Sequence, residues 1–265
     1  MLAEHGEEAR ILAGGQSLVP ILNFRLATPG HLVDINRLAE EGSEPQSDGH
    51  VVSIPPLMRQ ERAERSAVVA DLLPLLEEAV RFVGHPAIRS RGTVVGSIAH
   101  ADPAAELPAV LAALGGEIVS RRAGGRRTIS AGDFFTGPLE NSLEPEEWVE
   151  EVRIPVQRGA GAFEEFAQRS GDYALCGVAV VVERNGGGCA VTLAYLGVGD
   201  IARRLELESL DPDDIEGRGL EEAMHELVAT ELDPGDDVHA SAAYRRHLAV
   251  NLAVRAVRRA AGAQR

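Results

Sequence analysis

Hydrophobic and polar positions along the chain follow two patterns, short apolar runs and helical periodicity, which predict short strands and amphipathic helices. Apolar runs bounded by polar residues predict strands at residues 10–13, 31–35, 51–54, 116–121, 126–129 and 148–154. Apolar residues at helical spacing predict helices at 18–26 and from Pro103 to Leu114, and a mainly helical stretch from Glu61 to Arg91. Strands and helices are therefore mixed in this part of the chain, which predicts an α+β domain.

A stretch typical of a linker separates this part from the rest. Residues 155–161 contain one proline, two glycines and few large apolar side chains. Beyond them the pattern predicts strands at 162–169, 176–184 and 189–197, a turn at 185–188, and helices at 218–231 and 241–261. We therefore expect two α+β domains, residues 1–156 and residues 157–265.

The same pattern argues against a membrane segment or a secretory leader. The longest apolar run, Leu175–Val182, is far shorter than the roughly 20 residues that span a bilayer. The first eight residues have neither a basic region nor an apolar core, which a secretory signal needs. We expect a cytoplasmic protein with no membrane span.

Composition removes several kinds of chemistry. All 26 basic residues are arginine, and they stand against 41 acidic residues, which gives a net charge of −15. Without lysine the chain can form no Schiff base and has no P-loop lysine. The acidic balance also argues against a nucleic-acid partner, which needs a basic face. Any phosphate must therefore be held by backbone amides, hydroxyls or arginine.

The first candidate site is Ala13-Gly14-Gly15-Gln16-Ser17-Leu18, between a predicted strand and a predicted helix. Two glycines let the backbone turn sharply and approach a ligand, and a helix start offers free N–H groups to an anion. Ser17 suits the position that caps the helix. An ordinary strand-to-helix turn has the same pattern, so these residues alone leave both interpretations open.

A second glycine-containing stretch, Arg91–Ser97, also carries the hydroxyls of Thr93 and Ser97. Two such loops in one domain suggest a diphosphate held by backbone amides. His100, Asp102 and Glu106 follow at once.

Asp102 and Glu106 could accept hydrogen bonds from sugar or polyol hydroxyls, or simply complement the start of the next helix. Their spacing from His100 matches no structural zinc pattern, so we expect no metal site.

The turn Gly171-Asp172-Tyr173-Ala174-Leu175 opens an apolar strand of the second domain. It could place Tyr173 and Leu175 against a flat aromatic ligand, or the two side chains could belong to the core. Cys176 and Cys189 are the two cysteines of the chain, which is too few for an iron–sulfur cluster with four ligands.

These motifs together resemble the FAD-binding medium subunit of molybdenum hydroxylases, the carbon monoxide dehydrogenase and xanthine dehydrogenase family. The first flavin motif is matched by residues 12–18 with 32–36, and the second by residues 83–106. Residues 133–137, 171–174 and 240–246 match further motifs, so the resemblance spans nearly the whole chain.

The resemblance implies a two-part FAD-binding domain of the PCMH or vanillyl-alcohol-oxidase type, followed by a smaller α+β domain. It implies an oxidoreductase subunit whose FAD takes electrons from a [2Fe-2S] small subunit and passes them to an external acceptor. Those electrons come from a large subunit that carries the molybdenum cofactor. The isolated chain could also form a homodimer. No catalytic side chain is expected, because the cofactor carries the redox chemistry.

The resemblance also implies which residues contact FAD. The loops would hold the pyrophosphate, Asp102 and Glu106 would lie near the ribityl chain, and the Tyr173 turn would approach the isoalloxazine. Where relatives carry a lysine before that turn, this chain offers Arg169 as its cation. The expected cofactor-binding residues are Ala13, Gly14, Gly15, Gln16, Ser17, Leu18, Thr93, Gly96, Ser97, His100, Asp102, Glu106, Arg169, Asp172, Tyr173 and Leu175.

Three departures from the family pattern keep alternatives open. Val95 replaces the first glycine of a Thr-x-Gly-Gly-Ser motif, and Ile54–Met58 replaces a Gly-Ala-x-Thr motif. Family members also begin about one strand and half a helix earlier. The alternatives are a stand-alone flavoprotein oxidoreductase of the same fold, and a degenerate assembly module with weak or no FAD binding.

Overall fold

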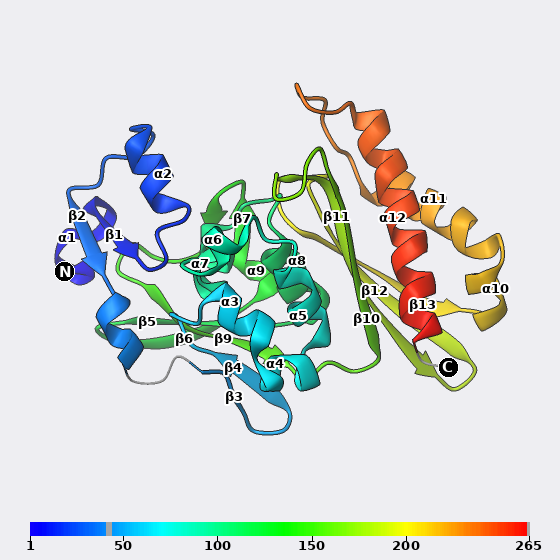
Figure 1. Ribbon diagram of the computed structural model, residues 1–265, viewed down its shortest axis with the longest axis horizontal. Coiled ribbons are helices and arrows are strands. Elements are labelled where there is room, and N and C mark those ends of the chain that lie inside the picture. Colours follow the sequence, from blue (N-terminus) through cyan, green and yellow to red (C-terminus); the bar gives the residue numbers. More distant parts are fainter. Residues whose placement is uncertain (41–43, 264–265) are drawn as a thin grey trace.

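The computed structural model describes residues 1–40 and 44–263 (Figure 1). It begins with a small unit in which β1 (Ala9–Leu12) pairs in parallel with β2 (His31–Asp34). Helix α2 (Leu18–Asn23) connects these two strands, as their parallel pairing requires. One short α-helix and two short 3-10 helices complete the unit: α1 (Leu2–His5), η1 (Gly6–Glu8) and η2 (Asn36–Glu40). The turn between β1 and α2 therefore lies at the carboxyl end of β1.

The first domain is built on a five-stranded antiparallel sheet with the order β3-β4-β9-β5-β6. Its strands are β3 (Gln46–Ser47), β4 (Val51–Ile54), β5 (Glu117–Arg122), β6 (Gly125–Ser130) and β9 (Trp148–Pro155). The central strand, β9, comes last in the chain, and its Val152 is fully buried. The sheet is therefore incomplete until the chain reaches residue 155.

The stretch from Glu61 to Arg91 is mainly helical, as predicted, but it is divided into several short helices. This stretch forms α3 (Gln60–Arg65), α4 (Ala67–Leu72), α5 (Pro74–Val80) and α6 (Pro86–Arg89). Pro74 and Pro86 each begin a new helix, because proline lacks the N–H that a helix interior needs. The apolar period persists across the breaks because the short helices bury residues against the same core.

Helix α7 (Val94–His100) and helix α8 (Glu106–Ala113) follow, and then α9 (Ala131–Phe134), β7 (Phe135–Gly137) and β8 (Glu140–Asn141). The predicted helix start at Pro103 is wrong, because the chain first makes a turn in which Asp102 Oδ1 accepts from the Ala104 amide at 2.9 Å. Residues 107–113 of α8 are all buried, since this helix lies between the two domains.

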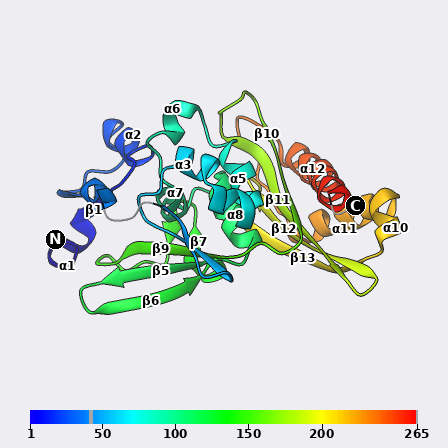
Figure 2. The ribbon, with the colours of Figure 1, turned by 60° about the horizontal axis from the view of Figure 1, so that its bottom comes forward.

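The second domain is a four-stranded antiparallel sheet in chain order. Its strands are β10 (Ala160–Ala167), β11 (Ala174–Asn185), β12 (Gly188–Leu196) and β13 (Arg203–Leu210). Figure 2 shows α11 and α12 on one side of this sheet and α5 and α8 on the other. The helices of this domain are α10 (Pro212–Glu216), α11 (Gly219–Glu231) and α12 (Ala242–Gly262), and the sequence patterns missed both α10 and β13.

Both faces of this sheet are buried, which explains the long apolar run in β11. Val178 and Val180 join the core beneath α12, whereas Ala179 and Val181 join the core of the first domain. A strand buried on both faces carries a continuous apolar stretch rather than an alternating one.

The predicted linker at 155–161 is tied down rather than free. The Val156 amide donates to the His50 carbonyl at 2.8 Å, and the Gln157 amide donates to the Leu72 carbonyl at 2.9 Å. Within the described residues, no helix has the length and apolar character that crossing a membrane would need.

Candidate functional site

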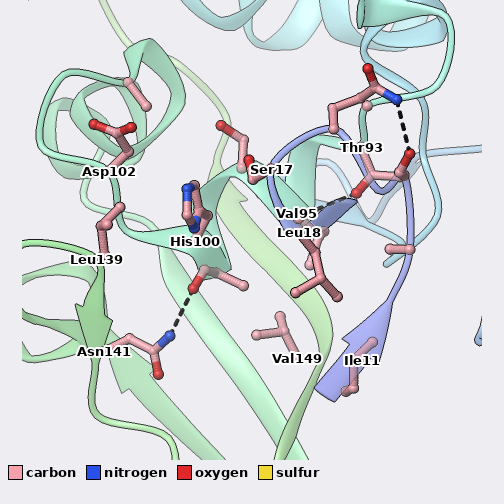
Figure 3. Close-up of a pocket in the computed structure, with 18 of the residues that line it drawn as sticks. Ile11, Ser17, Leu18, Thr93, Val95, His100, Asp102, Leu139, Asn141 and Val149 are labelled. Atoms are coloured by element: carbon pink, nitrogen blue, oxygen red, sulfur yellow. Dashed lines mark hydrogen bonds between the residues drawn. The ribbon is translucent and has the colours of Figure 1, made fainter. Parts of the chain in front are cut away.

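A cavity of about 1020 Å³ opens between the β1–α2–β2 unit, helices α7 and α8, and the turn before β11 (Figure 3). This volume lies at the upper end of the roughly 300–1,000 Å³ typical of ligand pockets, which suits a large ligand. Fourteen of the sixteen residues expected from the sequence line it: Ala13, Gly14, Gly15, Gln16, Ser17, Leu18, Thr93, Gly96, Ser97, His100, Asp102, Glu106, Asp172 and Tyr173.

The turn at residues 14–17 presents free backbone donors to this cavity. Gly15 has a φ of +74°, a conformation that other residues rarely adopt. Within the described part of the chain, the N–H groups of residues 14–17 donate to no acceptor. Ser17 stands at the position that caps α2, but its hydroxyl makes no capping bond. The turn thus leaves several donors available to an anionic ligand.

The second glycine stretch is a loop only as far as Thr93, so the prediction of a loop through Ser97 is wrong. Thr93 Oγ1 accepts from the Gly96 amide at 3.0 Å, which begins α7 inside the predicted loop. The two glycine turns touch each other. A Cβ on Gly14 would lie 2.4 Å from the Arg91 carbonyl oxygen, so only glycine fits there. The two turns therefore form one continuous wall of the cavity.

Val95, which replaces a family glycine, has no backbone strain. It lies in α7, has no positive φ, and is only 4% exposed within the core of the first domain. This departure from the family pattern therefore adds no backbone strain to α7.

The carboxylates beyond α7 have different environments. Glu106 is the first residue of α8, and burial, together with the charge of Asp102, raises its pKa to about 7. At neutral pH its carboxyl group can therefore either donate or accept a hydrogen bond. Burial lowers the pKa of His100, which favours its neutral form.

The turn before β11 separates this cavity from a second one of about 850 Å³. Tyr173 is 73% exposed and lines both cavities. Leu175 lines only the second, and its carbonyl accepts a hydrogen bond from the buried guanidinium of Arg245. Arg169 is exposed and lines neither. Leu175 and Arg169 are therefore the two expected residues that the fold does not bring to the main cavity.

Several lining residues were missed by sequence reasoning. Asn141 Nδ2 donates to the Ala99 carbonyl at 2.7 Å (Figure 3), and the Leu139 amide donates to the Ala101 carbonyl at 3.0 Å. These bonds hold the β7–β8 hairpin against the end of α7. The hairpin lies about forty residues further along the chain, and no local pattern marks it.

Gln60 was also missed. It lines the cavity while only 3% of its surface is exposed, and its Oε1 has no hydrogen-bond partner. It sits beneath Gly92, where a Cβ would come within 2.5 Å of that oxygen. A single glutamine at the start of a helix carries no signal that sequence reasoning could use.

The two domains match known protein families. Residues 1–157 match the family described as the FAD binding domain in molybdopterin dehydrogenase. The chain belongs to this family. Residues 161–260 match the carbon monoxide dehydrogenase flavoprotein C-terminal domain. The chain is thus an FAD-binding medium subunit of the molybdenum hydroxylase type, part of an oxidoreductase, and FAD is its cofactor.

Individual relatives agree with the family assignment. The chain is 40% identical over 251 residues to the 6-hydroxypseudooxynicotine dehydrogenase complex subunit alpha of Paenarthrobacter nicotinovorans, covering 92% of this chain and 84% of that protein. It is 36% identical to the carbon monoxide dehydrogenase medium chain of Hydrogenophaga pseudoflava, covering 78% and 72%.

Solved structures agree as well. The quinoline 2-oxidoreductase structure from Pseudomonas putida 86 superposes with a TM-score of 0.89 at 34% identity, covering 99% of this chain and 92% of that chain. The carbon monoxide dehydrogenase structure from Hydrogenophaga pseudoflava gives a TM-score of 0.88 at 32% identity, with the same two shares.

Proposed function

We propose that this chain holds FAD in the 1020 Å³ cavity and passes electrons from the iron–sulfur clusters of a small partner subunit through the flavin to an external acceptor. The observation that carries the proposal is the wall formed by the two glycine turns, in which residues 14–17 line the cavity and their backbone amides donate to no acceptor of the described chain. Backbone amides are suited to a pyrophosphate, and this lysine-free chain has no amine that could replace them.

The roles proposed for individual residues follow from their places in the cavity. The turn at 13–18 and residues Thr93–Ser97 hold the pyrophosphate, and Asp102 and Glu106 bond the hydroxyls of the flavin's polyol chain. Tyr173, on the wall shared with the second cavity, covers the flavin ring. Leu175 and Arg245 support that turn from behind.

The cofactor supplies the electron-transfer chemistry when it is bound, and the chain binds and orients it. The two cysteines are buried, unpaired and too few to hold a cluster, which supports a partner subunit as the carrier of the iron–sulfur clusters. Relatives named as medium chains or complex subunits support a multi-subunit assembly, and we propose a molybdenum-cofactor large subunit as the source of electrons. We place the boundary between the two domains at residues 156 and 157.

Co-expression with the neighbouring reading frames tests this proposal. We expect a complex of three chains whose substrate reduces the flavin only when the iron–sulfur subunit is present. A purified chain that binds no FAD would refute the cofactor site. An isolated chain that turns over a small substrate without partners would instead favour the stand-alone oxidoreductase.

A further inference from the structure

A hydrogen-bonded bracket behind the cavity joins the two glycine turns. Arg59, immediately before α3, donates from Nη2 to Asn36 Oδ1 at 2.8 Å. Its Nη1 donates to the carbonyl oxygen of Arg91, next to Gly92 of the second turn. A single guanidinium thus bonds in two directions, which its planar fork of donors permits.

Asn36 continues the bracket to the first turn. Its Nδ2 donates to the Ala13 carbonyl at 2.9 Å, immediately before Gly14. Asp34 Oδ1 holds the same amide group at 2.7 Å and also accepts from the Asn36 backbone at 2.9 Å. The path from Ala13 through Asn36 and Arg59 to Arg91 therefore consists of side chains whose own positions are fixed.

The close contact between the two turns means that the bracket fixes their relative position. Gly14 packs so closely on Arg91 and Gly92 that a Cβ would overlap both. A relative movement of the two turns would displace the unbonded amides of residues 14–17 from the second turn, with which they share the cavity wall. Hydrogen-bond donors bind an anion well only when they are oriented before it arrives.

Arg59 also contributes a positive charge next to the two turns. Within the described residues it forms no ion pair with a carboxylate, whereas Arg62 pairs with Glu44 and Arg65 with Glu61. Burial and the positive charges of Arg91 and Arg62 lower the pKa of Arg59, and arginine remains protonated all the same. A positive charge without a carboxylate partner thus stands behind the amides of the first turn.

We propose that Arg59, acting through Asn36, is the positioning residue that sets the pyrophosphate cradle and places a positive charge behind it. This inference rests on the proposed FAD site, and it assigns to Arg59 the electrostatic part that a lysine or Arg169 would otherwise have to play. The ligand part concerned is the diphosphate, not the flavin ring.

Fluorescence of Trp148 provides the readout, because this residue lines the cavity and is the single tryptophan of the chain. The full chain is freed of cofactor and titrated with FAD, with ADP as a pyrophosphate without flavin, and with riboflavin as a flavin without phosphate. The variants are Arg59→Met, Arg59→Lys and Asn36→Ala, with Arg65→Met, at the other end of α3, as the matched control. Each titration is repeated at low and high salt.

We expect Arg59→Met to weaken FAD and ADP by about tenfold or more, as the loss of charge-assisted hydrogen bonds predicts. Riboflavin affinity should stay the same, and the salt dependence of FAD binding should shrink. Arg59→Lys should keep the salt dependence but recover only part of the affinity, because an ammonium cannot span both acceptors. Asn36→Ala should weaken FAD, and the double variant with Arg59→Met should bind no worse than Arg59→Met alone.

Several results would overturn the inference. They are FAD binding by Arg59→Met at wild-type strength, an equal loss for riboflavin, or additive effects in the double variant. If Arg59→Met does not fold, Arg59→Lys and Asn36→Ala decide by the same criteria. If the unaltered chain binds no FAD, the proposed function fails along with this inference.

Discussion

Replacing Glu165 by glutamine should stabilise the protein, and only above about pH 5. Glu165 lies on β10, on the same face as the buried Phe163, which packs into the core of the first domain. Its Oε2 is covered and has no hydrogen-bond partner. Burial, with the nearby charge of Glu106, raises its pKa to about 8 from 4.5. An ionised carboxylate is therefore costly at this site.

The sign and size of the effect follow from proton linkage. The folded chain holds a proton on Glu165 that the unfolded chain releases above pH 4.5, so the destabilisation begins there and grows until about pH 8. At about 1.4 kcal/mol for each tenfold change in proton binding, the full penalty is on the order of 5 kcal/mol. Water reaches part of the side chain and Glu106 shares the repulsion, so we expect a gain of about 1 kcal/mol or more for Glu165→Gln at pH 8.

The assay is equilibrium urea unfolding of the cofactor-free chain at pH 5 and at pH 8, with thermal unfolding beside it. A gain of about 1 kcal/mol should raise the melting temperature by roughly 2–4 °C in a chain of this size. Glu164→Gln, at the neighbouring position, is the matched control. The Glu164 carboxylate pairs with Arg255 and Arg259, so this variant should lose stability. An equal change at both pH values, or a loss at pH 8, would refute the reasoning.

Three further substitutions test the site. Gly14→Ala should weaken FAD binding by about tenfold or more, because the added Cβ would lie 2.4 Å from the Arg91 carbonyl oxygen. The control, Gly132→Ala, should bind FAD normally in the same titration, because the nearest atom to its added Cβ lies at 3.8 Å. Val95→Gly should lower the free energy of unfolding in urea by about 2–4 kcal/mol, because it removes a buried side chain from a helix. A higher FAD affinity with no loss of stability would contradict our interpretation of Val95 as an unstrained core residue. Arg245→Met should lower the free energy of unfolding by about 2–4 kcal/mol, because it leaves the carbonyls of Leu175 and Gly197 without their hydrogen-bond donor. An unchanged denaturation midpoint would contradict this, and would show that water replaces the guanidinium as donor.

Much of the fold could be read from local pattern. The strands at 148–154 and 189–197 and the helices at 218–231 and 241–261 are found within a few residues of their predicted bounds. Strand β13 was missed because its exposed face carries charged residues such as Arg204 and Glu206, which hide the apolar positions. The stretch over 61–91 was predicted only as mainly helical, without the breaks between its helices, because its apolar period survives the prolines that divide it.

The sequence by itself determined which chemistry could hold a phosphate, because a chain without lysine is left with amides, hydroxyls and arginine. It also marked the glycine turns, since sharp turns and close approaches are local requirements. Only the tertiary structure decided which arginine stands at those turns. Sequence resemblance pointed to Arg169, which the fold leaves exposed, whereas Arg59 bonds both Asn36 and Arg91. Residues 13, 36, 59 and 91 carry no shared pattern, because they meet only when four separate segments pack together.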